Sequence, residues 1–155
     1  MRLRILAVGG KMPGWVASGY QEYARRLPPE FNTELIELPL GQRRKGEPPG
    51  RAIKQEGQAM LTALARDDRV VALAVDGKAW STPRLARHLR DWQSSGDNFS
   101  FLIGGPDGLD KACLERADQR WSLSALTLPH PLVRIMLVEQ LYRAWTINVG
   151  HPYHR

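Results

Sequence analysis

The chain has 155 residues, of which 43% are hydrophobic and 25% are charged, and its formal net charge is +6. This composition is typical of a one-domain globular protein and excludes a disordered chain. A single cysteine, Cys113, excludes an intrachain disulfide and a cysteine-based zinc cluster, and the longest apolar run, residues 70–75, is too short to span a membrane. We therefore expect a soluble, cytoplasmic protein that binds no metal.

The first third of the chain predicts a strand, a helix and a second strand. Residues 3–8 form a short apolar run that two glycines close, which is the pattern of a strand followed by a turn. Apolar residues at helical spacing follow Pro13, and the prolines at 28–29 are expected to end that helix. Residues 34–38 alternate polar and apolar side chains, which predicts a half-buried strand, and residues 41–50 predict a mobile basic loop.

Strands and helices continue to alternate after this loop. Residues 53–64 have helical spacing, and the apolar run 70–75 predicts a central parallel strand that is covered on both faces. Thr82 is expected to cap a helix that has Pro83 at its first position. Four further elements are a strand at 99–103, a short helix at 111–117, a short strand at 121–123 and a helix at 131–147. The sequence therefore predicts a single-domain α/β fold over residues 1–155, with a mostly parallel sheet flanked by helices.

Three loops of unusual composition follow the predicted strands, at residues 76–78, 104–108 and 124–130. Ligands of parallel α/β sheets bind beyond the carboxyl ends of the strands, so these loops are the candidate site. Two successive glycines, Gly104 and Gly105, permit a close approach of backbone to a ligand, although they could simply form the turn. The apolar run 123–128 could wall a pocket for a purine ring, or it could only cover the core.

Familiar catalytic and nucleotide motifs are absent. The glycines at 9–14 match neither the dinucleotide fingerprint nor the P-loop, and they indicate a plain turn. There is no G-x-S-x-G serine elbow, and Cys113 has apolar neighbours that favour a buried structural thiol. His151 and His154 are separated by a proline that disfavours the helix needed to pair them on a metal.

The last helix and the tail that follows it carry two further predictions. The helix is apolar nearly all round, so we expect burial on two sides, one of them against a second copy of the chain. Leu137 and Leu141 are the positions expected to face that copy. The tail, residues 151–155, combines two imidazoles, a phenol and a guanidinium, which favours a functional segment over a frayed end.

Several segments of the chain resemble a known family, namely residues 102–109, 121–134, 139–145 and 151–155. Over residues 1–155 the chain resembles the bacterial pseudouridine N3-methyltransferases of large-subunit rRNA, which are of the SPOUT class. The resemblance implies a homodimer with a C-terminal trefoil knot, S-adenosylmethionine as methyl donor, and 23S rRNA of the assembled ribosome as substrate. By matching positions it also assigns nine cofactor-binding residues: Leu73, Gly104, Gly105, Leu123, Ser124, Ala125, Leu126, Thr127 and Leu128.

The implied reaction requires that an imide N–H lose its proton while a methyl group is aligned with the nitrogen. The catalytic candidates are Arg143, Tyr153, His154 and Arg155. A cation among them could stabilise the developing imidate, or a base could accept the proton, and both versions remain open. The tail could complete the site of its own subunit or that of the partner. The basic residues 43–45 are expected to hold rRNA phosphates.

Two other classes of function remain alternatives at this stage. One is a nucleic-acid-binding module without catalysis, in which the 104–105 and 123–128 segments only pack. The other is a hydrolase or transferase that acts on a small anionic substrate, with the positive surface steering that substrate. Cofactor binding would exclude the first alternative, and salt-sensitive association with ribosomes would argue against the second.

Overall fold

The computed structural model describes residues 1–155 and contains one sheet of five parallel strands in the order β2-β1-β4-β3-β5. The parallel α/β architecture expected from the sequence is confirmed. The strands are β1 (Leu3–Val8), β2 (Glu34–Leu38), β3 (Arg69–Ala79), β4 (Phe99–Ile103) and β5 (Gln119–Ser122).

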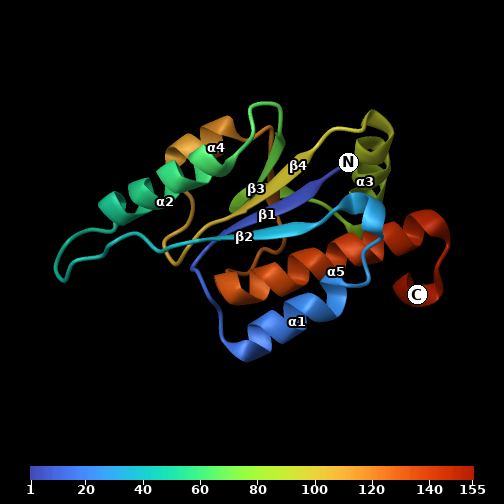
Figure 1. Ribbon diagram of the computed structural model, residues 1–155, viewed down its shortest axis with the longest axis horizontal. Coiled ribbons are helices and arrows are strands. Elements are labelled where there is room, and N and C mark those ends of the chain that lie inside the picture. The colour runs from blue at the N-terminus through green and yellow to red at the C-terminus, as the bar shows by residue number, and fades with distance from the viewer.

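Helices cover both faces of this sheet (Figure 1). On one face lie α2 (Gly50–Ala63) and α4 (Lys111–Arg116), and on the other lie α1 (Gly14–Ala24), α3 (Thr82–Ser95) and α5 (His130–Val149). Two 3-10 turns, η1 (Pro29–Phe31) and η2 (Pro152–His154), complete the elements. None of the helices combines the length and apolar character that crossing a membrane would need.

Strand β1 has buried side chains on both faces of the sheet, so helices must cover both faces. Its alternate residues Leu3, Ile5 and Ala7 belong to the larger hydrophobic cluster, under α1, α3 and α5. Leu6 and Val8 point to the other face and belong to the smaller cluster, under α2 and α4. Every residue of β1 is buried, which accounts for a strand that is apolar except at Arg4, whose guanidinium is paired with the buried Asp68 at 3.3 Å.

Several element boundaries differ from the sequence predictions by one to three residues, and two of the differences in helices have a clear physical reason. Helix α1 ends at Ala24, before the two prolines, so Leu27 is buried in the following turn rather than on the helix. Helix α3 is capped by Ser81, whose Oγ accepts the N–H of Arg84 at 3.2 Å. The prediction of Thr82 as the cap is therefore wrong by one residue. Ser81 has the extended backbone of a capping residue, whereas Thr82 is already the first residue of the helix.

Strand β3 is longer than predicted and contains a bulge. Its pairing with β5 is interrupted between Leu73 and Lys78, which both pair with Trp121. Val70, Val71 and Ala72 are buried, as predicted. The prediction that the run stays covered to residue 75 is wrong, because Val75 lies in the bulge and is 59% exposed. A Cβ on Gly77 would lie 2.7 Å from the carbonyl carbon of Arg120, so the return of β3 to the sheet requires glycine there.

Helix α5 is buried by its own chain more completely than expected. Leu137 and Leu141 have no exposed surface because they pack into the larger cluster with α1, α3 and the sheet. The prediction that they face a second copy is therefore wrong. The apolar residues of α5 that stay exposed before its last turn are Leu132 and Met136, at 39% and 37%.

Candidate functional site

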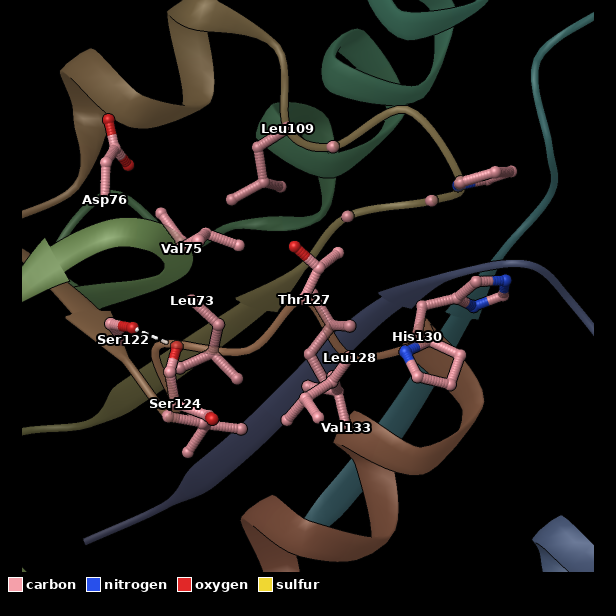
Figure 2. A pocket seen from close by; sticks show the side chains of 18 of the residues that line it. Leu73, Val75, Asp76, Leu109, Ser122, Ser124, Thr127, Leu128, His130 and Val133 are labelled. Atoms are coloured by element: carbon pink, nitrogen blue, oxygen red, sulfur yellow. Dashed lines mark hydrogen bonds between the residues drawn. The ribbon is translucent and has the colours of Figure 1, made fainter.

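A cavity of about 640 Å³ lies at the carboxyl ends of β3, β4 and β5 (Figure 2). Its walls come from residues 73–76, 103–106, 108–109, 114, 122–124, 126–130 and 133, which include most of the predicted loops at 104–108 and 124–130. Of the loop predicted at 76–78, only Asp76 lines the cavity, and the prediction of a loop there is wrong because β3 continues to Ala79 after its bulge. The volume is in the range of small-molecule sites, and this edge of a parallel sheet is where such sites occur.

Eight of the nine residues assigned to the cofactor line this cavity. They are Leu73, Gly104, Gly105, Leu123, Ser124, Leu126, Thr127 and Leu128. The ninth, Ala125, is exposed and does not line it. Its assignment followed from its place inside a continuous motif, but the folded loop leaves this position outside the cavity wall.

The cavity is mainly apolar with a few polar groups at defined places. Leu73, Val75, Leu109, Leu128 and Val133 form its apolar walls (Figure 2). The polar groups are the carboxylate of Asp76, the hydroxyls of Ser122, Ser124 and Thr127, and the imidazole of His130. Such a combination suits a ligand with a flat ring and a charged end.

Two hydrogen bonds fold the loop that follows β5. The hydroxyl of Ser122 donates to the backbone oxygen of Ser124 at 2.8 Å, and Ser124 Oγ accepts the N–H of Leu126 at 2.9 Å. These local bonds shape the apolar segment into a wall of the cavity. They also leave Leu126 72% exposed at the mouth of the cavity.

The sequence analysis did not assign several lining residues individually. Val75, Asp76, Leu109, His130 and Val133 all line the cavity. Asp76 was named as the start of a loop, and its position directly after an apolar strand was the available signal. His130 ends the apolar segment between two prolines; burial lowers its pKa, and the charge of Arg134 lowers it further.

The glycine turn between β4 and α4 is constrained by its own backbone. The N–H of Gly108 donates to the oxygen of Gly105 at 3.1 Å, and Gly108 has a φ of +85°. A Cβ on Gly104 would lie 2.6 Å from the carbonyl carbon of Gly108. Gly104 is therefore needed to close the turn itself, so a larger residue there would distort the turn as well as obstruct a ligand.

Arg43 differs from the other two residues of the predicted phosphate-binding group. Its Nη1 donates to Glu56 Oε2 at 2.7 Å and its Nε donates to Asp107 Oδ2 at 3.0 Å. The hydrogen bond to Glu56 is the main cause that raises the pKa of Arg43 above its ordinary value. Arg44 and Lys45 make no such contacts and are exposed, so only these two fit the predicted role.

The four catalytic candidates lie away from the cavity of their own chain. Arg143 follows His130 by thirteen residues on α5, which separates them by about 20 Å along the helix axis. Figure 1 shows the tail curling beyond the carboxyl end of that helix. His154 is half-buried and Arg155 is exposed in this tail.

The tail is nevertheless ordered against α5. Arg143 Nε and the hydroxyl of Tyr153 both donate to Glu139 Oε1, at 2.7 and 3.3 Å. The guanidinium of Arg143 lies 4.9 Å from the centre of the Tyr153 ring. Hydrogen bonding to Glu139 raises the pKa of Arg143, and burial followed by the charge of Glu139 raises the pKa of Tyr153. The structure thus brings two of the four candidates together, but at the far end of α5.

A buried arginine connects the start of α5 to the first loop. Arg134 is 1% exposed, and it donates to Glu37 Oε2 at 2.6 Å and to the backbone oxygen of Gly10 at 3.4 Å. Gly9 and Gly10 in turn donate their N–H groups to the oxygen of Leu38. These contacts hold the first loop, which the sequence indicated as a plain turn, beside His130 at the edge of the cavity.

Comparison with known proteins gives the family. A family model described as "Predicted SPOUT methyltransferase" matches residues 1–154. The chain belongs to the SPOUT methyltransferase family. Proteins named "Ribosomal RNA large subunit methyltransferase H" are 59% identical in Alkalilimnicola ehrlichii, 58% in Chromohalobacter salexigens and 56% in Hahella chejuensis. Each match covers all of this chain and 99% or 100% of the relative.

Membership of the SPOUT methyltransferases confirms the resemblance drawn from the motifs. The protein is an enzyme that transfers a methyl group, so both the non-catalytic binding module and the hydrolase are set aside. A methyltransferase needs a methyl donor, and the cavity at the ends of β3, β4 and β5 is the candidate place for it.

Proposed function

We propose that this methyltransferase modifies N3 of a pseudouridine in 23S rRNA of the assembled ribosome, with S-adenosylmethionine as the methyl donor. The observation that carries the proposal is the full-length similarity to relatives named as methyltransferases of large-subunit rRNA. The net charge of +6 suits a polyanionic substrate. In this role the enzyme acts in the cytoplasm, where ribosomes are.

The cavity residues fit S-adenosylmethionine. Leu73 of β3 and Leu128 of the loop between β5 and α5 provide apolar surface for an adenine ring, and the hydroxyls nearby can bond to its sugar. The carboxylate of Asp76 provides a negative charge for a cationic ligand. When bound, the cofactor supplies an electrophilic methyl group on its sulfonium. The trefoil knot implied by the resemblance would be formed by these same loops, and it stays a prediction.

The chain's own residues must manage the imide proton and the charge left behind. Loss of the N3 proton leaves a negative charge that is shared with the flanking carbonyl oxygens, and the new N–CH3 bond removes it. The guanidinium of Arg143, whose raised pKa keeps it charged, can stabilise that charge, and Arg155 in the tail is a second cation for the same role. His154 is the alternative, as a base that accepts the proton. The phenol of Tyr153 holds the tail against α5 through its hydrogen bond to Glu139.

A homodimer reconciles the position of the tail with that of the cavity. Arg143 is eleven residues from Leu132, about three helical turns, so it shares the exposed face of α5 with Leu132 and Met136. Trp15 on neighbouring α1 is 60% exposed and adds to the apolar surface. Pairing of two chains through this face would bring the tail of each to the cavity of the other.

The substrate surface extends from the cavity to the basic loop. Arg44 and Lys45 are exposed and without partners, as phosphate contacts require. These contacts would position the ribosome and would not take part in the chemistry.

Radiolabelled methyl transfer to ribosomes that lack the modification tests this proposal. The label should appear in 23S rRNA of whole ribosomes, and mapping should place it on N3 of one pseudouridine. Protein-free 23S rRNA serves as the matched substrate and should accept little label. A label on another base or at a carbon atom would overturn the assignment of N3, and failure to label any ribosome would overturn the proposed substrate.

A further inference from the structure

One side chain fastens the basic loop after β2 to the wall of the cavity. The guanidinium of Arg43 donates from Nη1 to Glu56 Oε2 at 2.7 Å and to the oxygen of Gly41 at 3.2 Å. Its Nε and Nη2 both lie 3.0 Å from Asp107 Oδ2. Arg43 therefore joins three parts of the chain: its own loop, helix α2 and the turn after β4.

The two carboxylates held by Arg43 have different roles. Glu56 is the fixed partner of Arg43, because it is 3% exposed on α2 and its Oε2 also accepts the N–H of Gly41 at 2.9 Å. Asp107 is the partner that Arg43 holds in place, because its side chain is 37% exposed and it belongs to the turn whose glycines line the cavity. A single hydrogen bond, from Gly108 to Gly105, otherwise closes that turn.

The carboxylate of Glu56 also packs against a glycine that lines the cavity. A Cβ on Gly105 would lie 3.3 Å from Glu56 Oε1, so the carboxylate is packed directly against this glycine. Oε1 is buried and has no hydrogen-bond partner. Arg43 is the only cation in contact with this buried group, so Glu56 and the turn are kept in place by the same guanidinium.

We propose that Arg43 is a positioning residue for the methyl donor: it ties the Gly104–Gly108 turn to α2, and it does not bind rRNA phosphate. This inference depends on the proposed function of the cavity as the S-adenosylmethionine site. A planar guanidinium can serve two carboxylates from separate edges, whereas an ammonium is a point charge without that geometry. Arg43→Lys should therefore keep the charge beside Glu56 but loosen the turn.

The test measures S-adenosylmethionine affinity by calorimetry and the KM values for cofactor and ribosome separately. Arg43→Lys and Asp107→Ala should each weaken cofactor binding about three- to tenfold, as the loss of a charged bridge predicts. Their KM for ribosomes, and its salt dependence, should stay at the wild-type value. Asp107→Glu should restore much of the cofactor affinity, which a merely structural role of Asp107 would not require.

Two control variants separate this effect from general loss of charge or stability. Asp97→Ala removes an ion pair of similar exposure, with Arg69 at 3.4 Å, at the amino ends of the strands, and should leave cofactor affinity unchanged. Arg44→Ala with Lys45→Ala should weaken ribosome binding and leave cofactor affinity unchanged. Thermal melting of each variant checks the fold, and Asp107→Ala, at an exposed position, should melt with the wild type.

Equal cofactor affinity in the wild type, Arg43→Lys and Asp107→Ala would overturn the inference and leave the proposed function standing. Arg43→Ala removes the charge that Arg43→Lys keeps. Weakened ribosome binding by Arg43→Ala, with a smaller salt slope and unchanged cofactor affinity, would also overturn the inference and make Arg43 a phosphate contact. A wild-type protein that does not bind S-adenosylmethionine would overturn the proposed function itself.

Discussion

Mixed dimers provide the most direct test of how the tail is used. One protomer lacks residues 153–155, and the other carries Thr127→Trp, which fills the cavity from an exposed loop position. Because the tail lies about 20 Å from the cavity of its own chain, deleting it should leave cofactor affinity unchanged. Each parent homodimer should be almost inactive in methyl transfer, since every site in it lacks either a cavity or a tail.

The mixed dimer should recover activity because one of its two sites combines an intact cavity with an intact tail. Random exchange of equal amounts yields about half mixed dimers, so the mixture should reach about a quarter of the wild-type rate. Radiolabelled methyl transfer to ribosomes after controlled reassociation measures this rate. Activity that stays at the sum of the two parent homodimers would refute the reasoning. The tail would then act in the site of its own subunit.

Four further predictions test the core, the proposed dimer face, the substrate surface and the response to pH. Leu141→Ala, at a position without exposed surface, should lower the free energy of unfolding by about 2–5 kcal/mol in urea titrations. Met136→Glu should dissociate the proposed dimer in sedimentation experiments, and each chain should stay folded. Replacing Arg44 and Lys45 by alanine should reduce the salt slope of ribosome binding by roughly one for each charge lost. Burial and nearby arginines lower the pKa of His88 in the folded state, so the unfolded chain binds more protons below about pH 6.5; stability should fall as pH drops through that value, and His88→Gln should flatten the fall.

Periodicity in the sequence was sufficient to predict most of the fold. Residues 34–38 and 99–103 are strands with the predicted bounds, because each pattern reflects how many faces of the strand are buried. The bulge of β3 was not predictable in this way. It depends on how Leu73 and Lys78 share Trp121 of β5, a residue that lies more than forty positions later in the chain.

The candidate site was predictable to the extent that it is built from consecutive residues. The glycine turn and the 123–128 segment are each one stretch of chain, and their position after strands predicted the cavity. The carboxylate partners of Arg43 were not predictable, because three adjacent basic residues look alike in a sequence. Its partner Asp107 lies 64 residues away, and only the folded chain shows that this guanidinium is held by carboxylates.

The apolar composition of helix α5 could be explained by burial against its own chain or against a second subunit. Its nearly continuous apolar surface indicated a second subunit, yet α1, α3 and the sheet of the same chain bury Leu137 and Leu141 completely. The face that remains for a partner is narrower and consists of Leu132 and Met136, and it also carries Arg143.

The cavity lies at one end of helix α5 and the tail at the other, so each chain alone has the two parts of the proposed site about 20 Å apart. Antiparallel contact of two such helices would set the start of one beside the end of the other. Two-fold symmetry would then complete both sites through the same contact that buries the exposed apolar face.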